Sequence, residues 1–164
     1  MKKLILFLAL ALPMLASAQK FGHINTQELF ALMPELKQVE ARLDSLNSQY
    51  ETLLASMQEE YQRKLQDYQS KQATMTDAIR QITEEELMSL QQRLQTTYTT
   101  AQQDVQKKQE EFLVPVQERM VKAIQKVGKD KGFTYIFNSS GATVYVAPDA
   151  IDVMEDVKKE LGIQ

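Results

Sequence analysis

Large apolar residues recur at alternating steps of three and four along the middle of the chain, and this spacing constrains the fold more than any other feature. Seven consecutive positions follow it without a break: Leu36, Val39, Leu43, Leu46, Tyr50, Leu53 and Met57. Such spacing places every member on one side of an α-helix and is typical of a coiled-coil seam. The pattern therefore predicts a long helix that packs along its length against another helix.

The apolar pattern then continues through two further series of residues. The first extends the same seam with a local change of pitch, through Tyr61, Leu65, Tyr68, Gln72, Met75, Ile79 and Ile82. The second comprises Leu87, Leu90, Leu94, Tyr98, Ala101, Val105 and Phe112. Between the two series, Thr83 and Glu86 match a capping box that can start a new helix, although Thr74, Thr76 and Asp77 also offer cap chemistry. We expect an antiparallel helical arm over residues 34–112, with its turn between Thr74 and Thr83.

The first 18 residues have the features of a bacterial secretory signal peptide. Lys2 and Lys3 precede an unbroken apolar run over residues 4–12, and small residues at 16–18 form a cleavage site. Nine apolar residues are too few to span a bilayer, and without Cys the chain is no lipoprotein. We expect cleavage after Ala18 and a periplasmic destination. Removing two lysines leaves 17 basic against 22 acidic side chains, so the mature protein is acidic, at net −5.

The two ends of the chain, residues 19–33 and 113–164, are expected to form one small body. Residues 21–25 are predicted to be a strand, and Asn25 with Glu28 is predicted to cap a short helix. Pro115 interrupts the helical pattern that leaves the arm, so we expect a kink or arm–body hinge there.

Two later segments of the body are rich in aromatic and β-branched residues. Residues 133–138 and 142–147, joined by a Ser-Ser-Gly turn, predict a β-hairpin. Gly132 is predicted to end the preceding helix, and Asp149 to cap a last one. Because so small a body makes a marginal core and leaves strand edges open, we expect oligomerisation. The strand residues expected to serve it are Phe21, Ile24, Phe133, Tyr135, Phe137, Val144 and Val146.

The composition offers little chemistry for catalysis. The chain has no Cys and a single His, which excludes disulfides, thiolate zinc sites, multi-histidine metal sites and a Cys nucleophile. His23 is interpreted as structural or exposed, and the carboxylates of residues 84–86 as the first turn of a helix. No phosphate-binding loop or continuous basic patch is present. We therefore predict no catalytic, cofactor or metal residues, no enzyme and no nucleic-acid partner.

The arm instead has the composition of a promiscuous binder. Met and Tyr side chains at the edges of a seam adapt to irregular apolar partners, although most of them are explained by helix packing alone. The candidate client-facing residues are Leu54, Met57, Tyr61, Tyr68, Met75, Met88 and Tyr98.

The order and lengths of these elements resemble the Skp/OmpH family of periplasmic chaperones over essentially the whole mature chain. The resemblance is carried by residues 20–25 leading into 28–30, by Pro115, and by residues 133–137 followed by 144–146. It implies an α+β, mostly α fold: a homotrimer whose strands share a β-barrel body, with three arms around a cavity. It also implies ATP-independent holding of unfolded outer-membrane proteins and their delivery for insertion, with the outer-membrane insertion machinery as a further candidate partner.

One property of the chain departs from that family. Well-known members are basic, whereas the mature chain here is net −5, which does not favour lipopolysaccharide binding or capture of acidic clients. We carry over no lipid-binding residues. The alternative interpretation is a structural or adaptor coiled-coil protein whose arm docks on one specific envelope partner.

Overall fold

The computed structural model describes residues 19–141 and 143–163, and the predicted signal peptide lies outside them. The chain divides into two compact units. The hairpin unit is Phe30–Val121, and the sheet unit combines the described residues up to Leu29 with those from Lys122 onward.

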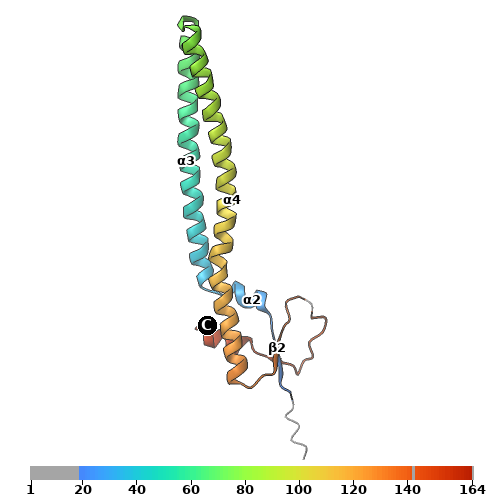
Figure 1. The fold of residues 1–164 in the computed structure, drawn as a ribbon. Helices are drawn as coiled ribbons and strands as arrows, with labels where there is room; N and C mark the ends of the chain where they lie inside the picture. Colours follow the sequence, from blue (N-terminus) through green and yellow to red (C-terminus); the bar gives the residue numbers. More distant parts are fainter. Residues whose placement is uncertain (1–18, 142, 164) are drawn as a thin grey trace, which may run out of the picture. The chain divides into compact units, whose positions relative to one another are not determined.

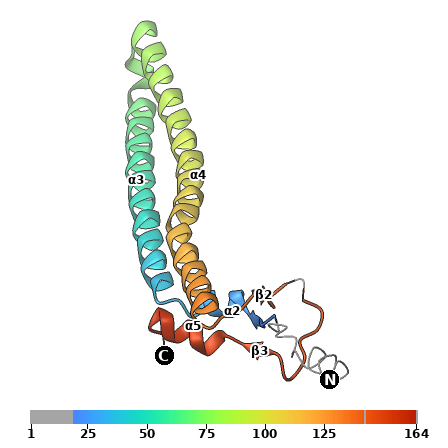
Figure 2. The same ribbon diagram turned by 60° about the horizontal axis from the view of Figure 1, so that its bottom comes forward.

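The hairpin unit is built from two long helices, which confirms the predicted helical hairpin. Helix α3 spans Glu35–Lys71, and α4 spans Asp77–Asp130 and continues into the sheet unit. The short 3₁₀ helix η2, Gln72–Thr74, connects them. The two helices run side by side in opposite directions in both views (Figure 1, Figure 2).

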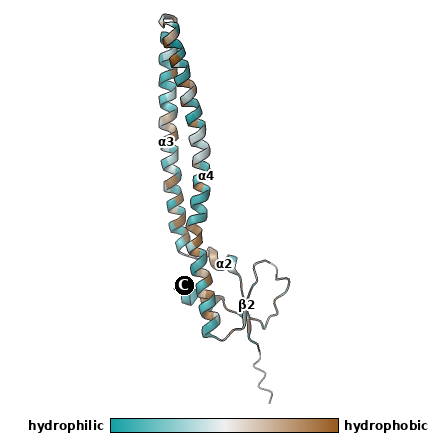
Figure 3. Ribbon diagram, in the orientation of Figure 1, coloured by the Kyte–Doolittle hydropathy of each residue, from teal (hydrophilic) through white to brown (hydrophobic). Residues whose placement is uncertain are grey.

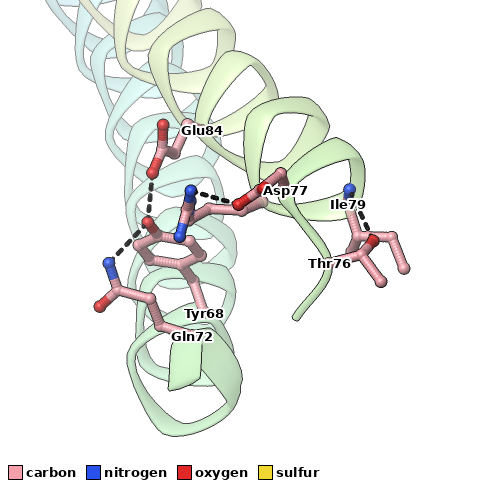
Figure 4. Close-up of polar contacts among 7 residues, drawn as sticks. Tyr68, Gln72, Thr76, Asp77, Ile79 and Glu84 are labelled. Carbon is pink, nitrogen blue, oxygen red and sulfur yellow. Dashed lines mark hydrogen bonds and ion pairs between the residues drawn. The ribbon is translucent and has the colours of Figure 1, made fainter. Parts of the chain in front are cut away.

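The turn of the hairpin occupies residues 72–76 and therefore begins before the predicted range. Thr76 caps α4, since its Oγ1 accepts a hydrogen bond from the Ile79 backbone N–H at 3.4 Å (Figure 4). Of the candidate caps, Thr76 is therefore confirmed and Thr83 is wrong. Thr83 lies inside α4, and its hydroxyl donates to the Ile79 carbonyl at 2.8 Å. The side chains of Thr76 and Thr83 can both cap a helix, and the position of the turn decides which of them caps α4.

The shift of the turn also changes which residues form the seam. Leu87, Leu90 and Ala101 of the predicted second series are buried, which confirms that part of the pattern. Ile79 and Ile82, predicted on the first helix, belong to α4 and are 52% and 58% exposed. Two further corrections concern α3, where the seam takes a step of four after Tyr50. Leu53 is 44% exposed, whereas Leu54, which the predicted spacing leaves out of the seam, is half-buried.

The sheet unit contains a three-stranded parallel sheet rather than the predicted β-hairpin. Its strands are β1, Phe21–Ile24, β2, Tyr135–Asn138, and β3, Ile151–Asp152, in the order β2-β1-β3. Phe21 pairs with Tyr135, and Gly22 pairs with both Ile136 and Ile151. Residues 143–147 lie in no strand, so the predicted second strand of the hairpin is wrong. Strand β1 is the central strand of the sheet, and the local sequence did not predict this position.

Two short helices complete the fold. Helix α2, Thr26–Ala31, begins where predicted, because Asn25 Oδ1 accepts a hydrogen bond from the Glu28 backbone N–H at 3.1 Å. Helix α5, Met154–Leu161, begins later than predicted. Asp152 Oδ1, not Asp149, accepts from the first turn of α5, at 2.9 Å from the Met154 nitrogen.

The core of the sheet unit forms on one side of the sheet. Its fully buried members include Ile24, Leu29, Val153 and Val157, and the last turns of α4 add Ala123 and Val127. Helix α4 ends at Asp130, and the predicted stop residue Gly132 follows it in the left-handed conformation, with φ +68°. The Phe133 backbone N–H then donates to the Gly128 carbonyl at 2.9 Å, which closes a Schellman motif.

Candidate functional site

Several open hollows lie on the described hairpin unit, and residues of both helices line the two largest. The larger has a volume of about 690 Å³. Its lining is uncharged and rich in glutamine: Gln58, Tyr61, Met88, Gln91, Gln92, Leu94 and Gln95. The second has a volume of about 390 Å³ and is lined by Asn47, Tyr50, Glu51, Leu54, Tyr98, Ala101, Gln102 and Val105. The hairpin therefore offers shallow binding surfaces rather than an enclosed pocket.

Four of the seven candidate client-facing residues line these hollows. Tyr61 and Met88 line the larger one, and Leu54 and Tyr98 the second. Met88 and Tyr98 are 63% and 48% exposed, so α3 does not cover them. Hydrophobic and hydrophilic residues are mixed along both helices (Figure 3). Contact of these residues with a client stays a prediction.

The other three candidates do not line either hollow. Met57 is half-buried within α3, and Met75 is half-buried between η2 and α4. Tyr68 is engaged near the turn: its hydroxyl donates to Glu84 Oε1 and accepts from Gln72 Nε2 at 3.0 Å (Figure 4). The Tyr68 hydroxyl is therefore already hydrogen-bonded within the chain.

Polar contacts join the two helices at four levels of the hairpin, one of which is the ion pair between Arg119 and Glu35. Besides the contact of Tyr68, the Tyr50 hydroxyl donates to Asp104 Oδ2 at 2.9 Å, and Lys64 Nζ donates to Glu86 Oε2 at 2.8 Å. The hydrogen bond to Asp104 raises the pKa of the Tyr50 phenol, and the one to Glu84 raises the pKa of Tyr68. These directional contacts help to fix the register of α3 against α4.

One face of the sheet is aromatic and open. The rings of Phe21, Tyr135 and Phe137 lie 6.0 Å apart between centroids, and each residue is about half exposed. A hollow of about 300 Å³ adjoins Phe21 and Phe137 and reaches Tyr145 and Val146. This face is a candidate interface, because monomers rarely leave clustered aromatic side chains uncovered.

The remaining predicted oligomerisation residues are placed differently. Ile24 is 1% exposed, so it serves the core of its own chain. Phe133 precedes β2 and is half-buried, with Lys20 Nζ 4.2 Å from its ring centroid. Val144 and Val146 belong to no strand, and Val144 is fully exposed. The prediction that all seven are strand residues is therefore wrong for Phe133, Val144 and Val146.

Pro115 lies inside α4, which runs through it from Asp77 to Asp130. Proline has no backbone N–H, so the carbonyl of Glu111 lacks its usual partner within the helix. A hollow of about 250 Å³ adjoins Pro115 between the two helices of the hairpin. A hinge at Pro115 stays a prediction.

The part of the chain that the structure describes shows no arrangement typical of a metal site. It brings together no group of three or more His, Cys, Asp or Glu side chains that could hold a metal ion. His23 lies on β1, and its Nδ1 atom is buried without a hydrogen-bond partner among the described residues. In residues 19–141 and 143–163, no helix is long and apolar enough to cross a membrane.

Sequence reasoning missed the glutamine lining of the larger hollow. Gln91, Gln92 and Gln95 lie within one turn of each other, which the sequence shows. Their position opposite Gln58 and Tyr61 depends on the turn of the hairpin, which the sequence left open.

Comparisons with known proteins agree with this architecture. A family model described as "Outer membrane protein (OmpH-like)" matches residues 20–161. A curated protein named Chaperone protein Skp, from Pectobacterium atrosepticum, is 26% identical over 98% of this chain and 99% of its own. The crystal structure of a protein assigned as an outer membrane chaperone (OmpH-like), from Caulobacter crescentus, has 17% identity and a TM-score of 0.73, over 87% of this chain and 83% of its own. The chain therefore belongs to the OmpH-like family, to which the Skp chaperone is related.

Proposed function

We propose that this protein is an ATP-independent holdase chaperone of the periplasm, which binds unfolded outer-membrane proteins and prevents their aggregation. The observation that carries the proposal is the hairpin, with open hollows on its flanks lined by exposed Met, Tyr and Gln side chains. Family membership and the name of the Skp relative support the same activity.

The physical requirements of holding an unfolded β-barrel protein fit such surfaces. The client exposes alternating apolar residues and unpaired backbone groups, and it aggregates when left in water. A holdase must shield many different segments without selecting one sequence. Methionine and tyrosine side chains in shallow hollows suit this task, because they adapt to irregular apolar shapes.

The proposal includes association of copies through the sheet unit, as a homotrimer. The open aromatic face of Phe21, Tyr135 and Phe137 is available to a second copy. Residues 143–147 have the composition of a strand but no strand partner within the described part of their own chain. Pairing with another copy would satisfy both features, and several hairpins would then surround one client.

The proposal also includes export and delivery. The N-terminal 18 residues direct the chain to the periplasm, where no ATP is present, and the client is passed on for insertion into the outer membrane. Many weak contacts make release without nucleotide hydrolysis feasible, because each contact breaks separately.

Two measurements on residues 19–164 test the proposed function. The first is the mass in solution; the second is light scattering of a urea-unfolded outer-membrane β-barrel protein after dilution, with and without the protein and without nucleotide. We expect a trimer and suppression at about one trimer per client. A protein that leaves the client to aggregate contradicts the holdase function, and a pull-down would then test the adaptor alternative.

A further inference from the structure

We propose that the larger hollow of the hairpin is a binding site for the extended backbone of an unfolded polypeptide, recognised by side-chain amides. The inference rests on the proposed chaperone function and names the chemistry of its contact with the client. The site is called here the glutamine groove, and its members are Gln58, Tyr61, Met88, Gln91, Gln92 and Gln95.

The amides of the groove are free to bind a ligand. Within the described part of the chain, none of the four glutamine side chains donates or accepts a hydrogen bond. The second hollow differs, because Gln102 Nε2 there donates to the Tyr98 hydroxyl at 3.0 Å and a carboxylate, Glu51, joins the lining. Of the two hollows, the glutamine groove is the one that combines free amides with an uncharged lining.

A primary amide matches the peptide group chemically. Each glutamine offers N–H donors and a carbonyl acceptor, so it can bond to backbone N–H and C=O groups of any sequence. An unfolded β-barrel protein presents such unpaired groups along its whole length. Because the groove contains no charged side chain, recognition there is independent of the charge of the client segment.

The spacing of the amides also suits an extended chain. Gln91 and Gln95 are four positions apart, which is a rise of about 6 Å along α4. Every second residue of an extended strand repeats at about 6.6 Å. Two amides on α4 can therefore meet alternate peptide groups of one client strand.

The apolar part of the groove receives client side chains. Met88 is 63% exposed, and Tyr61 is half-buried on the opposite helix. Side chains of a β-barrel protein alternate between apolar and polar along each strand. A strand bound by its backbone would direct its apolar side chains toward Met88 and Tyr61 and its polar side chains toward solvent.

The test compares two triple variants of equal charge on α4. The groove variant is Q91E/Q92E/Q95E, and the matched control is Q103E/Q106E/Q109E, whose sites are exposed on the same helix and line neither hollow. Binding of a fluorescently labelled, urea-unfolded β-barrel protein is measured by anisotropy for the wild type and both variants, at 0.5 M salt to screen the added charges. Circular dichroism and mass in solution confirm that the variants keep fold and assembly.

We expect the groove variant to raise Kd about tenfold, since a carboxylate cannot donate to client carbonyls, whereas the control stays within about twofold of the wild type. Equal Kd values for the groove variant and the control overturn the inference. A wild-type protein that does not bind the client overturns the proposed function itself, which separates the two failures.

A second measurement decides the matter if the groove variant does not fold. The chain has no cysteine, so Gln91→Cys and Gln106→Cys each place one thiol on α4. A client that carries a thiol-reactive crosslinker should react at position 91 several times more than at position 106. Equal crosslinking at the two positions contradicts the groove as the site.

Discussion

Replacement of Gly22 by alanine tests how the central strand packs against the core of the sheet unit. A Cβ at this position would lie 2.9 Å from Phe133 Cε1 and 3.2 Å from Val153 Cγ1. Val153 is 0% exposed, so it has no room to withdraw. Overpacking of this kind costs about 1–3 kcal/mol, and the smaller entropy of the unfolded alanine chain returns about 0.4–1 kcal/mol. Taking the middle of each range, we therefore expect Gly22→Ala to lower the free energy of unfolding by about 1 kcal/mol.

Gly128→Ala is the matched control, with the same chemical change in the same unit. Its Cβ would meet only the Cδ1 methyl of Ile136, at 3.2 Å, and that methyl is the flexible end of a side chain. Gly128 lies inside α4, where alanine is favoured over glycine by about 1 kcal/mol. We expect Gly128→Ala to leave the protein equally stable or more stable, opposite in sign to Gly22→Ala.

Both variants are measured by urea unfolding of residues 19–164, followed by circular dichroism at one fixed protein concentration, because association would shift the midpoint. Hydrogen exchange of the β1 amides reports the sheet unit separately from the hairpin. A Gly22→Ala midpoint equal to or above that of the wild type would refute the packing argument. Destabilisation by Gly128→Ala of the same size would show that the effect is not specific to β1.

Three further predictions concern caps and pH. Gly132→Ala places a side chain at φ +68° and should cost about 1 kcal/mol of unfolding free energy, measured by thermal unfolding; an unchanged Tm would contradict this. Asn25→Ala removes the acceptor of the Glu28 N–H and should cost about 1 kcal/mol, whereas Asn25→Ser should recover most of it in urea unfolding. Because the pKa values of Tyr50 and Tyr68 are raised above the ordinary 10.0 in the folded state, their hydrogen bonds stabilise the hairpin below pH 10 and are lost as the pH rises through the raised values. The double variant Tyr50→Phe, Tyr68→Phe should therefore lose less thermal stability than the wild type between pH 9 and 12, and an equal loss would refute the assignment.

The helical hairpin could be predicted because its signal is local. Seam residues such as Leu87 and Leu90 repeat at helical spacing, and that spacing indicates which side of the helix is buried. The cap at Asn25 and the stop at Gly132 are local in the same sense, since each depends on one side chain or on its absence. The turn was harder to place, because Thr76 and Thr83 both carry cap chemistry.

The candidate surfaces depended on contacts between distant residues. The glutamine groove needs Gln58 and Gln91 on facing helices, and their pairing follows from a turn whose position the sequence did not decide. The aromatic face needs Phe21 beside Tyr135, which are more than a hundred residues apart.

The sequence by itself determined the long amphipathic helices, the cap at Asn25, the stop at Gly132 and the resemblance to the family, because periodicity, cap chemistry and element order are properties of neighbouring residues. Only the tertiary structure decided which segments pair as strands of the sheet and in what order. Residues 143–147 have strand composition, yet β2 pairs with β1 rather than with them. A strand exists only when a partner supplies its hydrogen bonds, and which distant segment does so depends on how the whole chain packs.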